Sequence, residues 1–476
     1  MKVLLVNPYT DTDRTAGAFK SFLEAMPPIS IAYVAAALEE AGIPVACYDD
    51  FIHGGSLTEF EEYVRQEKPD IIGFSSVTPT APGVTKLSRF CRDRFPDLTL
   101  IQGGVHATVF AEMLLSNGET DVIIHNEGEI TTVKLVEALA NGNDLSTVKG
   151  ISYLDDGMVC KTPPQPMIED LDSIPFPAWH LLEWDRYRLF NFARVASPAT
   201  LVLGSRGCPY RCNFCSLTVM GHNRRKRSIP NLVDECEYMW DRYGFKQMAY
   251  VDPIFPISKK EAIAFRDEVV KRGLQKHQVW TTETRVDLMC RETVDAMYES
   301  GCRRVMFGFE TGDQETLESI RKDFDLQQAY NAVRLCKQVG MEVIGFFIVG
   351  SPGETERSIN MTIDFSCDLG IEFAKYTCYV PYPGTEVYYD FLKDGTLKEP
   401  ECYQFERYTS YPTPDNPAIY VTPALTQDEL QKLQKKAFRK FYMRPRMIYR
   451  HLFEIRALNA NDMINGLRLV FAPTAS

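Results

Sequence analysis

Short apolar runs alternate with helical segments through the first third of this chain, and this alternation restricts its fold more than any other feature. The apolar runs lie at 2–7, 44–49, 70–76, 99–104 and 121–126. Each run ends in Asn, Asp, Ser or Gly, and the segments between them repeat apolar residues at helical spacing. Such an alternation predicts a parallel sheet with helices on both faces. We therefore expect an α/β domain, doubly wound and Rossmann-like, with five strands over residues 1–145.

A second series of strand and helix patterns begins near residue 196. Its apolar runs lie at 200–205, 247–252, 279–287, 303–312, 341–354 and 374–386. Six strand–helix units predict a partial (β/α)6 barrel over residues 196–400. The prolines within residues 146–195 exclude a long helix and indicate a linker module. The interleaved aromatic and basic residues of 401–476 predict a C-terminal helical cap over the active site, with plain helix packing as the alternative.

Composition limits the possible partners. The chain has 476 residues and a formal net charge of −12, spread along the sequence apart from a basic run at 222–227. We expect that run to be a solvated surface, and the charge pattern gives no indication of nucleic-acid binding. No apolar run reaches the roughly 20 residues that span a bilayer, and the apolar part of the N-terminus is too short for a signal peptide. We expect a cytoplasmic protein without a transmembrane segment.

Three of the 13 cysteines, Cys208, Cys212 and Cys215, lie close together in the sequence GCPYRCNFC, directly after the first predicted barrel strand. Most of the others stand singly and are typical of small buried apolar residues. Structural zinc sites and four-cysteine iron–sulfur clusters each take four protein ligands, so three thiolates leave one metal position for another ligand. A Cys₃His zinc site completed by His222 is the alternative to an iron–sulfur cluster with an open iron.

Polar and glycine-rich residues follow four of the five predicted strands of the first domain. Ligands of parallel sheets bind beyond the carboxyl ends of the strands, so we expect a binding surface at this edge. Its candidate residues are Asn7, Ser75, Ser76, Thr78, Gly103, Gly104, His106, Asn126, Glu127 and Gly128. No GxGxxG follows the first strand, which argues against a dinucleotide. Turn formation alone is the alternative explanation for each of these residues.

Candidate residues of the barrel likewise follow its predicted strands. The active sites of parallel barrels lie in the loops at the carboxyl ends of the strands. Beyond the cysteines, these positions contain Asp252, Glu283, Arg285, Glu310, Gly350, Pro352 and Tyr382. A salt bridge between Arg285 and Glu310 inside the barrel is the structural alternative to a ligand-binding role for these two residues.

The spacing CxxxCxxC, with Phe214 before the third cysteine, resembles the radical S-adenosylmethionine (SAM) superfamily. The first domain and the segments GGVHAT, NEGE, IPFPAW, VGSPGET and PYPGTE resemble its cobalamin-binding branch. This branch includes radical SAM C-methyltransferases and proteins similar to anaerobic magnesium-protoporphyrin IX monomethyl ester cyclase. The resemblance covers nearly the whole chain. It implies a [4Fe–4S] cluster on the three cysteines, with the fourth iron open to the amino and carboxylate groups of SAM, and cobalamin on the first domain.

The resemblance also implies positions around SAM. The expected contacts are Phe214, Gly350, Pro352 and Tyr382 at the adenine, Asp252 at the amino group, Arg285 at the carboxylate or the substrate, and Glu310 at the ribose. Two departures from related sequences stand out. Many relatives have two consecutive acidic residues where this chain has Asp252 and Pro253, so a function of the second acid is in doubt. The first domain lacks a DxHxxG motif after its first strand, and we expect His106 at the edge of cobalamin rather than on cobalt.

The implied activity is methylation of an unactivated carbon. In this chemistry, reduced ferredoxin or flavodoxin supplies an electron that cleaves SAM to a 5′-deoxyadenosyl radical, and methylcobalamin gives its methyl group to the substrate radical. Radical cyclisation or oxidation without methyl transfer is the alternative among enzymes. A non-catalytic cobalamin or metal sensor is the alternative outside them. The organic substrate stays open between a lipid, a tetrapyrrole, a peptide and a secondary metabolite.

Overall fold

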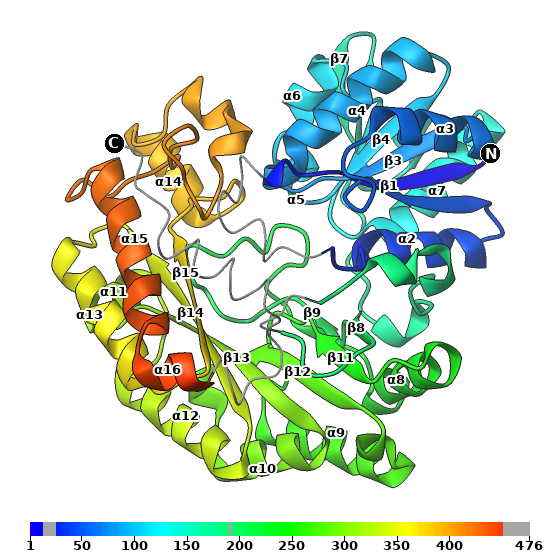
Figure 1. Cartoon of the computed structure of the whole chain (residues 1–476). Helices are drawn as coiled ribbons and strands as arrows, with labels where there is room; N and C mark the ends of the chain where they lie inside the picture. Colours follow the sequence, from blue (N-terminus) through cyan, green and yellow to red (C-terminus); the bar gives the residue numbers. More distant parts are fainter. Residues whose placement is uncertain (13–24, 190–192, 451–476) are drawn as a thin grey trace.

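The first part of the chain forms a mixed sheet. The structure, a computed structural model, describes residues 1–12, 25–189 and 193–450 (Figure 1). Within these residues the first sheet has the strand order β2-β1-β3-β4-β5-β6-β7. Its parallel strands are β1 (Val3–Asn7), β2 (Val45–Asp49), β3 (Ile71–Ser75), β4 (Thr99–Gly103) and β5 (Val122–Ile124). The five strands expected over residues 1–145 are therefore confirmed.

Two further strands extend this sheet beyond the expected five. Strands β6 (Ile151–Asp155) and β7 (Met158–Lys161) form an antiparallel hairpin that pairs with β5, although the sequence indicated only a linker here. The two residues between them, Asp156 and Gly157, both have positive φ angles, of 48° and 78°. An Asp-Gly pair with two positive φ angles is the usual connection of a two-residue hairpin. The Asp-Gly pair in the sequence is typical of a hairpin, but the prolines that follow it favoured the interpretation as a linker.

Helices cover both faces of the first sheet. The helices are α2 (Ile29–Glu40), α3 (Leu57–Glu67), α4 (Ala81–Arg94), α5 (Val105–Val109), α6 (Ala111–Ser116) and α7 (Gly128–Asn141). Along β1, Val3 and Leu5 pack in one apolar cluster with α2 and α7, whereas Leu4 and Val6 pack in another with α3 and α4. Because successive side chains of a strand point to opposite faces, this division confirms the doubly wound arrangement.

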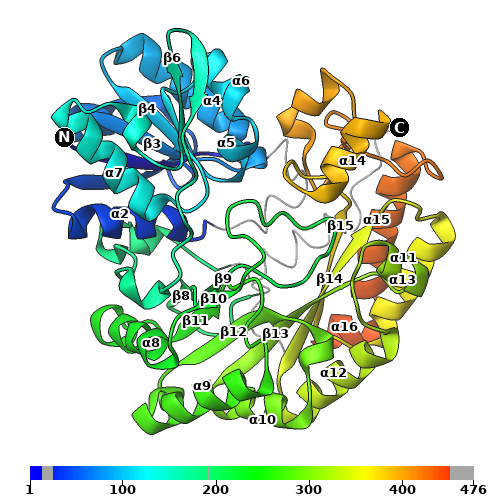
Figure 2. The same ribbon diagram turned by 180° about the vertical axis from the view of Figure 1, so that it is seen from behind.

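The second sheet is an open barrel of parallel strands. Among the described residues its strands are β8 (Ala199–Val202), β11 (Gln247–Tyr250), β12 (Val279–Thr284), β13 (Cys302–Glu310), β14 (Glu342–Val349) and β15 (Phe373–Cys378). They pair in sequence order, with β8 and β15 at the two edges, which confirms the partial (β/α)6 barrel. The outer helices are α8 (Ile229–Tyr243), α9 (Lys259–Arg272), α10 (Arg291–Glu299), α11 (Gln314–Ser319), α12 (Leu326–Val339) and α13 (Glu356–Asp368) (Figure 2). Helix α14 (Glu386–Asp394) lies beyond the end of β15, where it packs against the first domain.

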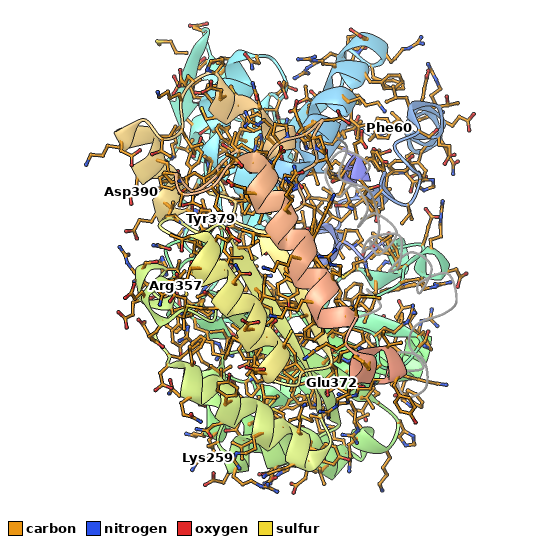
Figure 3. All side chains as sticks on the ribbon, turned by 60° about the vertical axis from the view of Figure 1, so that its left-hand side comes forward. Phe60, Lys259, Arg357, Glu372, Tyr379 and Asp390 are labelled. Carbon is orange, nitrogen blue, oxygen red and sulfur yellow. The ribbon has the colours of Figure 1, made fainter. Side chains whose placement is uncertain are left out.

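The C-terminal helices lie against the edge strand β15. Helix α15 (Gln427–Tyr442) runs along β15 and α13, and α16 (Pro445–Tyr449) follows it (Figure 3). The ring of Phe438 packs 5.1 Å from that of Tyr376, and the Tyr442 hydroxyl donates a hydrogen bond to the Ala374 carbonyl at 2.8 Å. Helix α15 therefore covers an open edge of the sheet, as edge strands require. Residues 451–476, which belong to the expected helical cap, lie outside the described residues.

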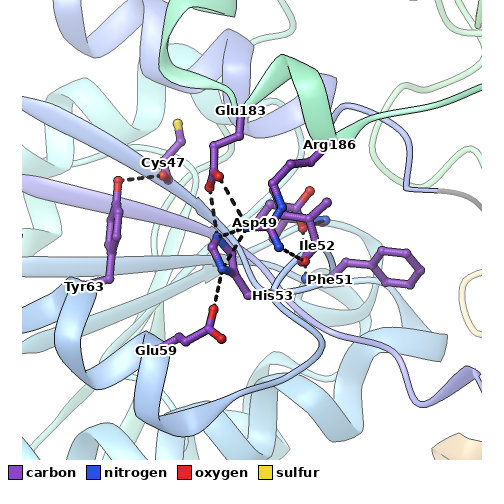
Figure 4. A network of polar contacts seen from close by, with 10 residues as sticks. Cys47, Asp49, Phe51, Ile52, His53, Glu59, Tyr63, Glu183 and Arg186 are labelled. Carbon is purple, nitrogen blue, oxygen red and sulfur yellow. Dashed lines mark hydrogen bonds and ion pairs between the residues drawn. The ribbon is translucent and has the colours of Figure 1, made fainter.

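The segment between the two sheets is held by both. On the barrel side, the buried Trp179 indole donates a hydrogen bond to Glu235 of α8 at 3.3 Å. On the other side, His53 follows β2, and its Nδ1 lies 2.7 Å from a carboxylate oxygen of Glu59 while its Nε2 lies 2.9 Å from one of Glu183 (Figure 4). Arg186 donates a hydrogen bond to the Ile52 carbonyl. These contacts fix the position of the first domain over the barrel.

Among the described helices, none combines the length and apolarity needed to cross a bilayer.

Gly104, directly after β4, provides a test of the first domain. Its φ is +103°, and a Cβ here would lie 2.5 Å from the Ser76 carbonyl oxygen. Gly118 also has a positive φ, of +69°, but no atom within 4 Å of such a Cβ. We expect Gly118→Ala to cost about 1–2 kcal/mol of strain, and Gly104→Ala to cost roughly 1–3 kcal/mol more because the backbone must move. Thermal unfolding of both variants checks this, and equal losses in Tm would contradict it.

Candidate functional site

The three cysteines lie on a loop whose two ends are paired. The loop begins after β9 (Ser205–Arg206) and ends before β10 (Arg225–Lys226), and these two short strands are antiparallel partners. Gly207 has a φ of +82°, and a Cβ there would lie 2.3 Å from the Asn223 carbonyl oxygen. The N–H of Cys208 donates a hydrogen bond to the Gly221 carbonyl at 3.3 Å. The pairing of β9 with β10 therefore fixes the loop beyond the carboxyl end of β8, between the two sheets (Figures 1 and 2).

The opposite side of the cysteine loop contacts the far strands of the barrel. Asn213 donates hydrogen bonds to the carbonyls of Ser319 and Ile320, at 2.9 and 3.4 Å, at the end of α11. Near the end of the sixth strand unit, Gly384 packs so closely that a Cβ would lie 2.4 Å from the Thr218 hydroxyl. Phe214 and Tyr382 both pack at the border of one apolar cluster. The structure thus brings together two of the residues expected around the adenine of SAM.

The thiol groups of the loop influence one another. Burial, and to a smaller extent the neighbouring thiols of Cys212 and Cys208, raise the pKa of Cys215 to about 11. Burial also raises the pKa of Cys212, against the opposing effect of Lys322 and Arg285. Metal binding must therefore displace protons from these thiols, which then act as thiolate ligands.

The described residues do not form the zinc site of the alternative. Within the part of the chain that the structure describes, no three His, Cys, Asp or Glu side chains converge to hold one metal ion. His222, the fourth ligand in the zinc alternative, is exposed. A four-iron cluster binds each cysteine thiolate through a different iron, so its ligands surround a larger volume than a single ion.

Two ion pairs line the mouth of the barrel beside the cysteines. Lys322 pairs with Glu310 at 2.6 Å, and the ammonium group lies 5.9 Å from the Phe214 ring. Arg285 pairs with Asp287 at 2.9 Å. The alternative of a direct salt bridge between Arg285 and Glu310 is therefore wrong.

The arrangement at the mouth depends on two residues that the sequence did not indicate. The Arg285 guanidinium lies 3.7 Å from the ring centroid of Tyr210, which is on the cysteine loop. The Glu310 carboxylate packs directly against Gly308 of β13. Any larger residue at position 308 would clash with it, because a Cβ there would lie 2.3 Å from a Glu310 carboxylate oxygen. Glu310 itself has a φ of +65°. Tyr210 lies within the cysteine motif, but its contact with Arg285, like the contact of Lys322 with Glu310, forms only in the folded chain.

Asp252 holds the start of the cysteine loop. One carboxylate oxygen accepts the Gly204 N–H at 2.9 Å, and the other accepts the Ser205 hydroxyl at 2.5 Å. The side chain is buried, and burial raises its pKa to about 6 although these two hydrogen bonds oppose the shift. Both oxygens are therefore used within the protein, at the position where the resemblance implied a contact with the SAM amino group.

The turn after β14 is built around a buried carboxylate. Gly350 has a φ of +84° and packs against Leu430 of α15, and half-buried Pro352 follows in the turn. Glu354 accepts the Ser351 N–H at 2.8 Å. Its other carboxylate oxygen is buried and has no hydrogen-bond partner among the described residues, and burial raises its pKa to about 7. The sequence marked this turn for its glycines and did not single out the carboxylate.

A cavity of about 200 Å³, open at its mouth, lies at the edge of the first sheet. Six residues expected at this edge line it: Ser75, Gly103, Gly104, Asn126, Glu127 and Gly128. Apolar side chains from β1, α2 and β4, including Leu5, Ile31 and Ile101, form its interior. Leu203, Arg206, Val219 and Met220 close it on the barrel side. The cavity is therefore built by both domains, and its barrel wall flanks the cysteines.

Four other candidates of this edge do not line the cavity: Asn7, Ser76, Thr78 and His106. Asn7 donates a hydrogen bond to Asp49 at 2.8 Å. His106 is buried between Phe110 and Phe405, whose ring centroids lie 4.7 and 4.5 Å away. Burial lowers the pKa of His106 to about 3, and neither ring nitrogen has a hydrogen-bond partner among the described residues. The structure thus places His106 in a packed aromatic contact between the domains, separate from this cavity.

Buried ion pairs join the two domains at the cavity wall. Arg206 of β9 donates to Glu127 at 2.8 Å and to Glu129 at 2.6 Å, while Arg225 of β10 donates to Glu127 at 2.7 Å. The prediction that the basic run 222–227 is a solvated surface is wrong for Arg225 and Arg227, which are buried. Charge alone could not identify their partners: Arg225 binds Glu127, 98 residues away, whereas Arg227 binds Glu235, eight residues away.

Known proteins match both domains. The radical SAM superfamily domain matches residues 202–366, and the B12 binding domain matches residues 17–136. The chain is 30% identical, over 99% of both chains, to a Pyrococcus horikoshii protein named uncharacterized methyltransferase PH0819. It is 31% identical to an anaerobic magnesium-protoporphyrin IX monomethyl ester cyclase of Rubrivivax gelatinosus, over 93% of this chain and 78% of the relative. This chain belongs to the cobalamin-binding radical SAM family.

A solved structure gives the same fold. The radical SAM methyltransferase TsrM of Kitasatospora setae aligns with a TM-score of 0.70 and 16% identity, over 97% of this chain and 89% of that one. The predicted family and α/β fold class of this radical SAM protein are confirmed. The matched radical SAM region contains the cysteine loop, and the matched B12 region contains much of the cavity. The donor sets fit these cofactors, because three thiols share one loop and an open, mostly apolar cavity lies at the edge of the matched B12 region.

Replacement of the loop cysteines tests the cluster site. We expect Ala at Cys208, Cys212 or Cys215 to abolish labile sulfide and SAM cleavage after anaerobic reconstitution, because each thiolate binds a separate iron. Cys160→Ala, in strand β7, should retain both and is the matched control. Iron and sulfide analysis checks the result. A loop variant that still cleaves SAM, or about one zinc without sulfide in the wild type, would refute the cluster site.

Asp252 should make the stability of this protein depend on pH. Its folded pKa of about 6 lies above the unfolded value of about 3.9, so the folded state gains the proton first as pH falls. The free energy of unfolding of the wild type relative to Asp252→Asn should therefore rise by on the order of 1 kcal/mol between pH 7 and pH 5. Thermal unfolding of the cluster-free proteins measures this. A Tm difference between the two proteins that is equal at both pH values would contradict it.

Proposed function

We propose that this protein is a cobalamin-dependent radical SAM methyltransferase that methylates an unactivated carbon. The observation that carries the proposal is the shared wall between the cavity and the cysteine loop. Leu203, Arg206, Val219 and Met220 border the cavity on the barrel side and flank the cysteines in the sequence. A methyl carrier in that cavity would lie beside the position where SAM is cleaved. The Pyrococcus relative named a methyltransferase matches over almost the whole chain and supports methyl transfer.

The domains divide the work in this proposal. Residues 1–145 would bind cobalamin, residues 196–400 would hold the cluster and SAM, residues 146–195 would connect them, and helix α15 would complete the barrel wall. When bound, the cluster would supply the electron that cleaves SAM, and cobalamin would carry the methyl group. The side chains would act by binding and orientation and by excluding water from reactive species.

The mouth of the barrel would orient SAM through residues already held in place. Arg285 is fixed by Asp287 and Tyr210. Its Nε and Nη2 donate to Asp287, so Nη1 would be the donor to a carboxylate. The Lys322–Glu310 pair lies between Phe214 and the end of β13, where Glu310 could accept hydrogen bonds from ribose hydroxyls. We propose that Asp252 acts by positioning the cysteine loop, because both of its oxygens are occupied.

The substrate would enter the barrel beside Glu283 and Lys375. The exposed Glu283 of β12 and the half-buried Lys375 of β15 lie close enough that each favours the charged form of the other. A polar or charged group of the substrate would contact this pair. A reduced ferredoxin or flavodoxin would donate the electron, and we propose a cytoplasmic location, where such donors are reduced.

An isotope experiment separates methyl transfer from cyclisation. The reduced, cobalamin-loaded protein is incubated anaerobically with methyl-deuterated SAM and an extract of metabolites from the source cells. We expect a product that gains an intact labelled methyl group, because transfer of the methyl breaks none of its carbon–hydrogen bonds. S-adenosylhomocysteine should form alongside 5′-deoxyadenosine, since one SAM is used for methylation and another for radical formation. Mass spectrometry follows all three compounds, with the Cys212→Ala protein as the control.

The cyclase alternative gives a different result. A cyclase or oxidase would form 5′-deoxyadenosine without stoichiometric S-adenosylhomocysteine, and its product would lack the label. That outcome would replace the proposed activity and would leave the family, the fold and the cofactor sites unchanged.

A further inference from the structure

Four charged side chains are buried together where the first domain meets the cysteine loop. Arg206 reaches two carboxylates with one guanidinium group, Glu127 at 2.8 Å and Glu129 at 2.6 Å. Glu127 also binds Arg225 at 2.7 Å and the Ile168 N–H at 2.8 Å. All four side chains are no more than 6% exposed. Two positive and two negative charges balance, so the cluster is electrically neutral.

The sequence positions of these residues connect two sites. Arg206 is two residues before Cys208, and Arg225 is its partner across the β9–β10 ladder that closes the cysteine loop. Glu127 and Glu129 lie at the start of α7, where Glu127, Glu129 and Arg206 all line the cavity of the first domain. The Arg206 guanidinium thus lines the first-domain cavity and also lies at the base of the loop that contains the three cysteines.

The contacts leave little room for independent movement. A planar guanidinium that binds two carboxylates fixes direction as well as distance, which a lysine ammonium does not. The ring of Tyr33, on α2, lies 5.1 Å from the Arg206 guanidinium and borders it on the first domain. By contrast, Lys226 on the same ladder is 58% exposed, and its nearest carboxylate, Glu261, lies 3.9 Å away on the barrel. Lys226 therefore provides a matched control for charge on this strand.

We infer that Arg206 is a positioning residue that couples occupation of the first-domain cavity to the arrangement of the cysteine loop. A ligand in the cavity that orders the start of α7 would order β9 through Glu127 and Glu129. Assembly of the cluster would in turn order the cavity wall, because coupling between two sites is reciprocal. The inference rests on the proposed function, which places cobalamin in the cavity and the cluster on the loop.

The affinity for hydroxocobalamin, with and without the cluster, tests this coupling. We expect the dissociation constant of the wild type to be at least about fivefold lower after cluster assembly, the lower end of typical coupling between sites. The double variant Arg206→Gln, Glu129→Gln removes one charge of each sign and leaves Glu127 paired with Arg225. Its two dissociation constants should differ by less than about twofold, whereas Lys226→Gln should keep the wild-type difference. Arg206→Lys should keep part of the wild-type difference between the two dissociation constants, because the positive charge remains. The rest should be lost, because an ammonium group cannot fix the direction of two carboxylates.

A second measurement does not require the variant to assemble a cluster. In cluster-free protein, hydroxocobalamin should slow hydrogen–deuterium exchange of residues 207–224 in the wild type and in Lys226→Gln, but not in the double variant. Equal protection of the loop in the double variant, or equal coupling in the affinity measurement, would overturn the inference. Cobalamin binding to the wild type without any effect of the cluster or on the loop would also overturn it and leave the proposed function intact. A wild type that binds no hydroxocobalamin would contradict both.

Discussion

The short ladder between β9 and β10 is the constraint on which the rest of this site depends. It closes the cysteine loop at its base, and each of its strands contributes an arginine to the buried carboxylates of the first domain. Burial would raise the pKa of Glu127, but hydrogen bonds from Arg225 and Arg206 outweigh that effect and hold the pKa below its usual range. Removal of one partner would leave a buried charge without compensation, at a cost of about 3–5 kcal/mol. The position of the thiols and the contact between the domains therefore depend on the same ladder and its arginines.

Two ion pairs stabilise the mouth of the barrel beside the cysteine loop. Lys322 with Glu310, and Arg285 with Asp287, satisfy one another before any ligand is present. Such preorganised groups need little rearrangement when a charged ligand binds, which is the usual advantage of an enzyme site over water. Asp252 adds to this order from the other side, because it holds the two residues that lead into β9.

Periodicity and motif spacing predicted the parallel strands of both sheets, the cysteine loop and six of the residues that line the cavity. These features depend on local patterns that a sequence displays directly. The β6–β7 hairpin was missed because prolines after it suggested an irregular linker. The basic run was misinterpreted because alternate strand residues face different partners: Arg224 reaches Glu261 on α9, and Arg225 reaches the first domain. Pairings such as Lys322 with Glu310 could not be predicted, since they depend on loops that meet only in the folded chain.

The cysteine loop and the first-domain cavity are neighbours that share a wall. The most direct test is electron paramagnetic resonance of protein that contains both a reduced [4Fe–4S] cluster and cob(II)alamin. We predict that the two spins interact, so that each signal is broadened or split relative to protein loaded with one cofactor alone. Two unperturbed signals, equal to the sum of the separately loaded samples, would place the cofactors far apart and contradict it.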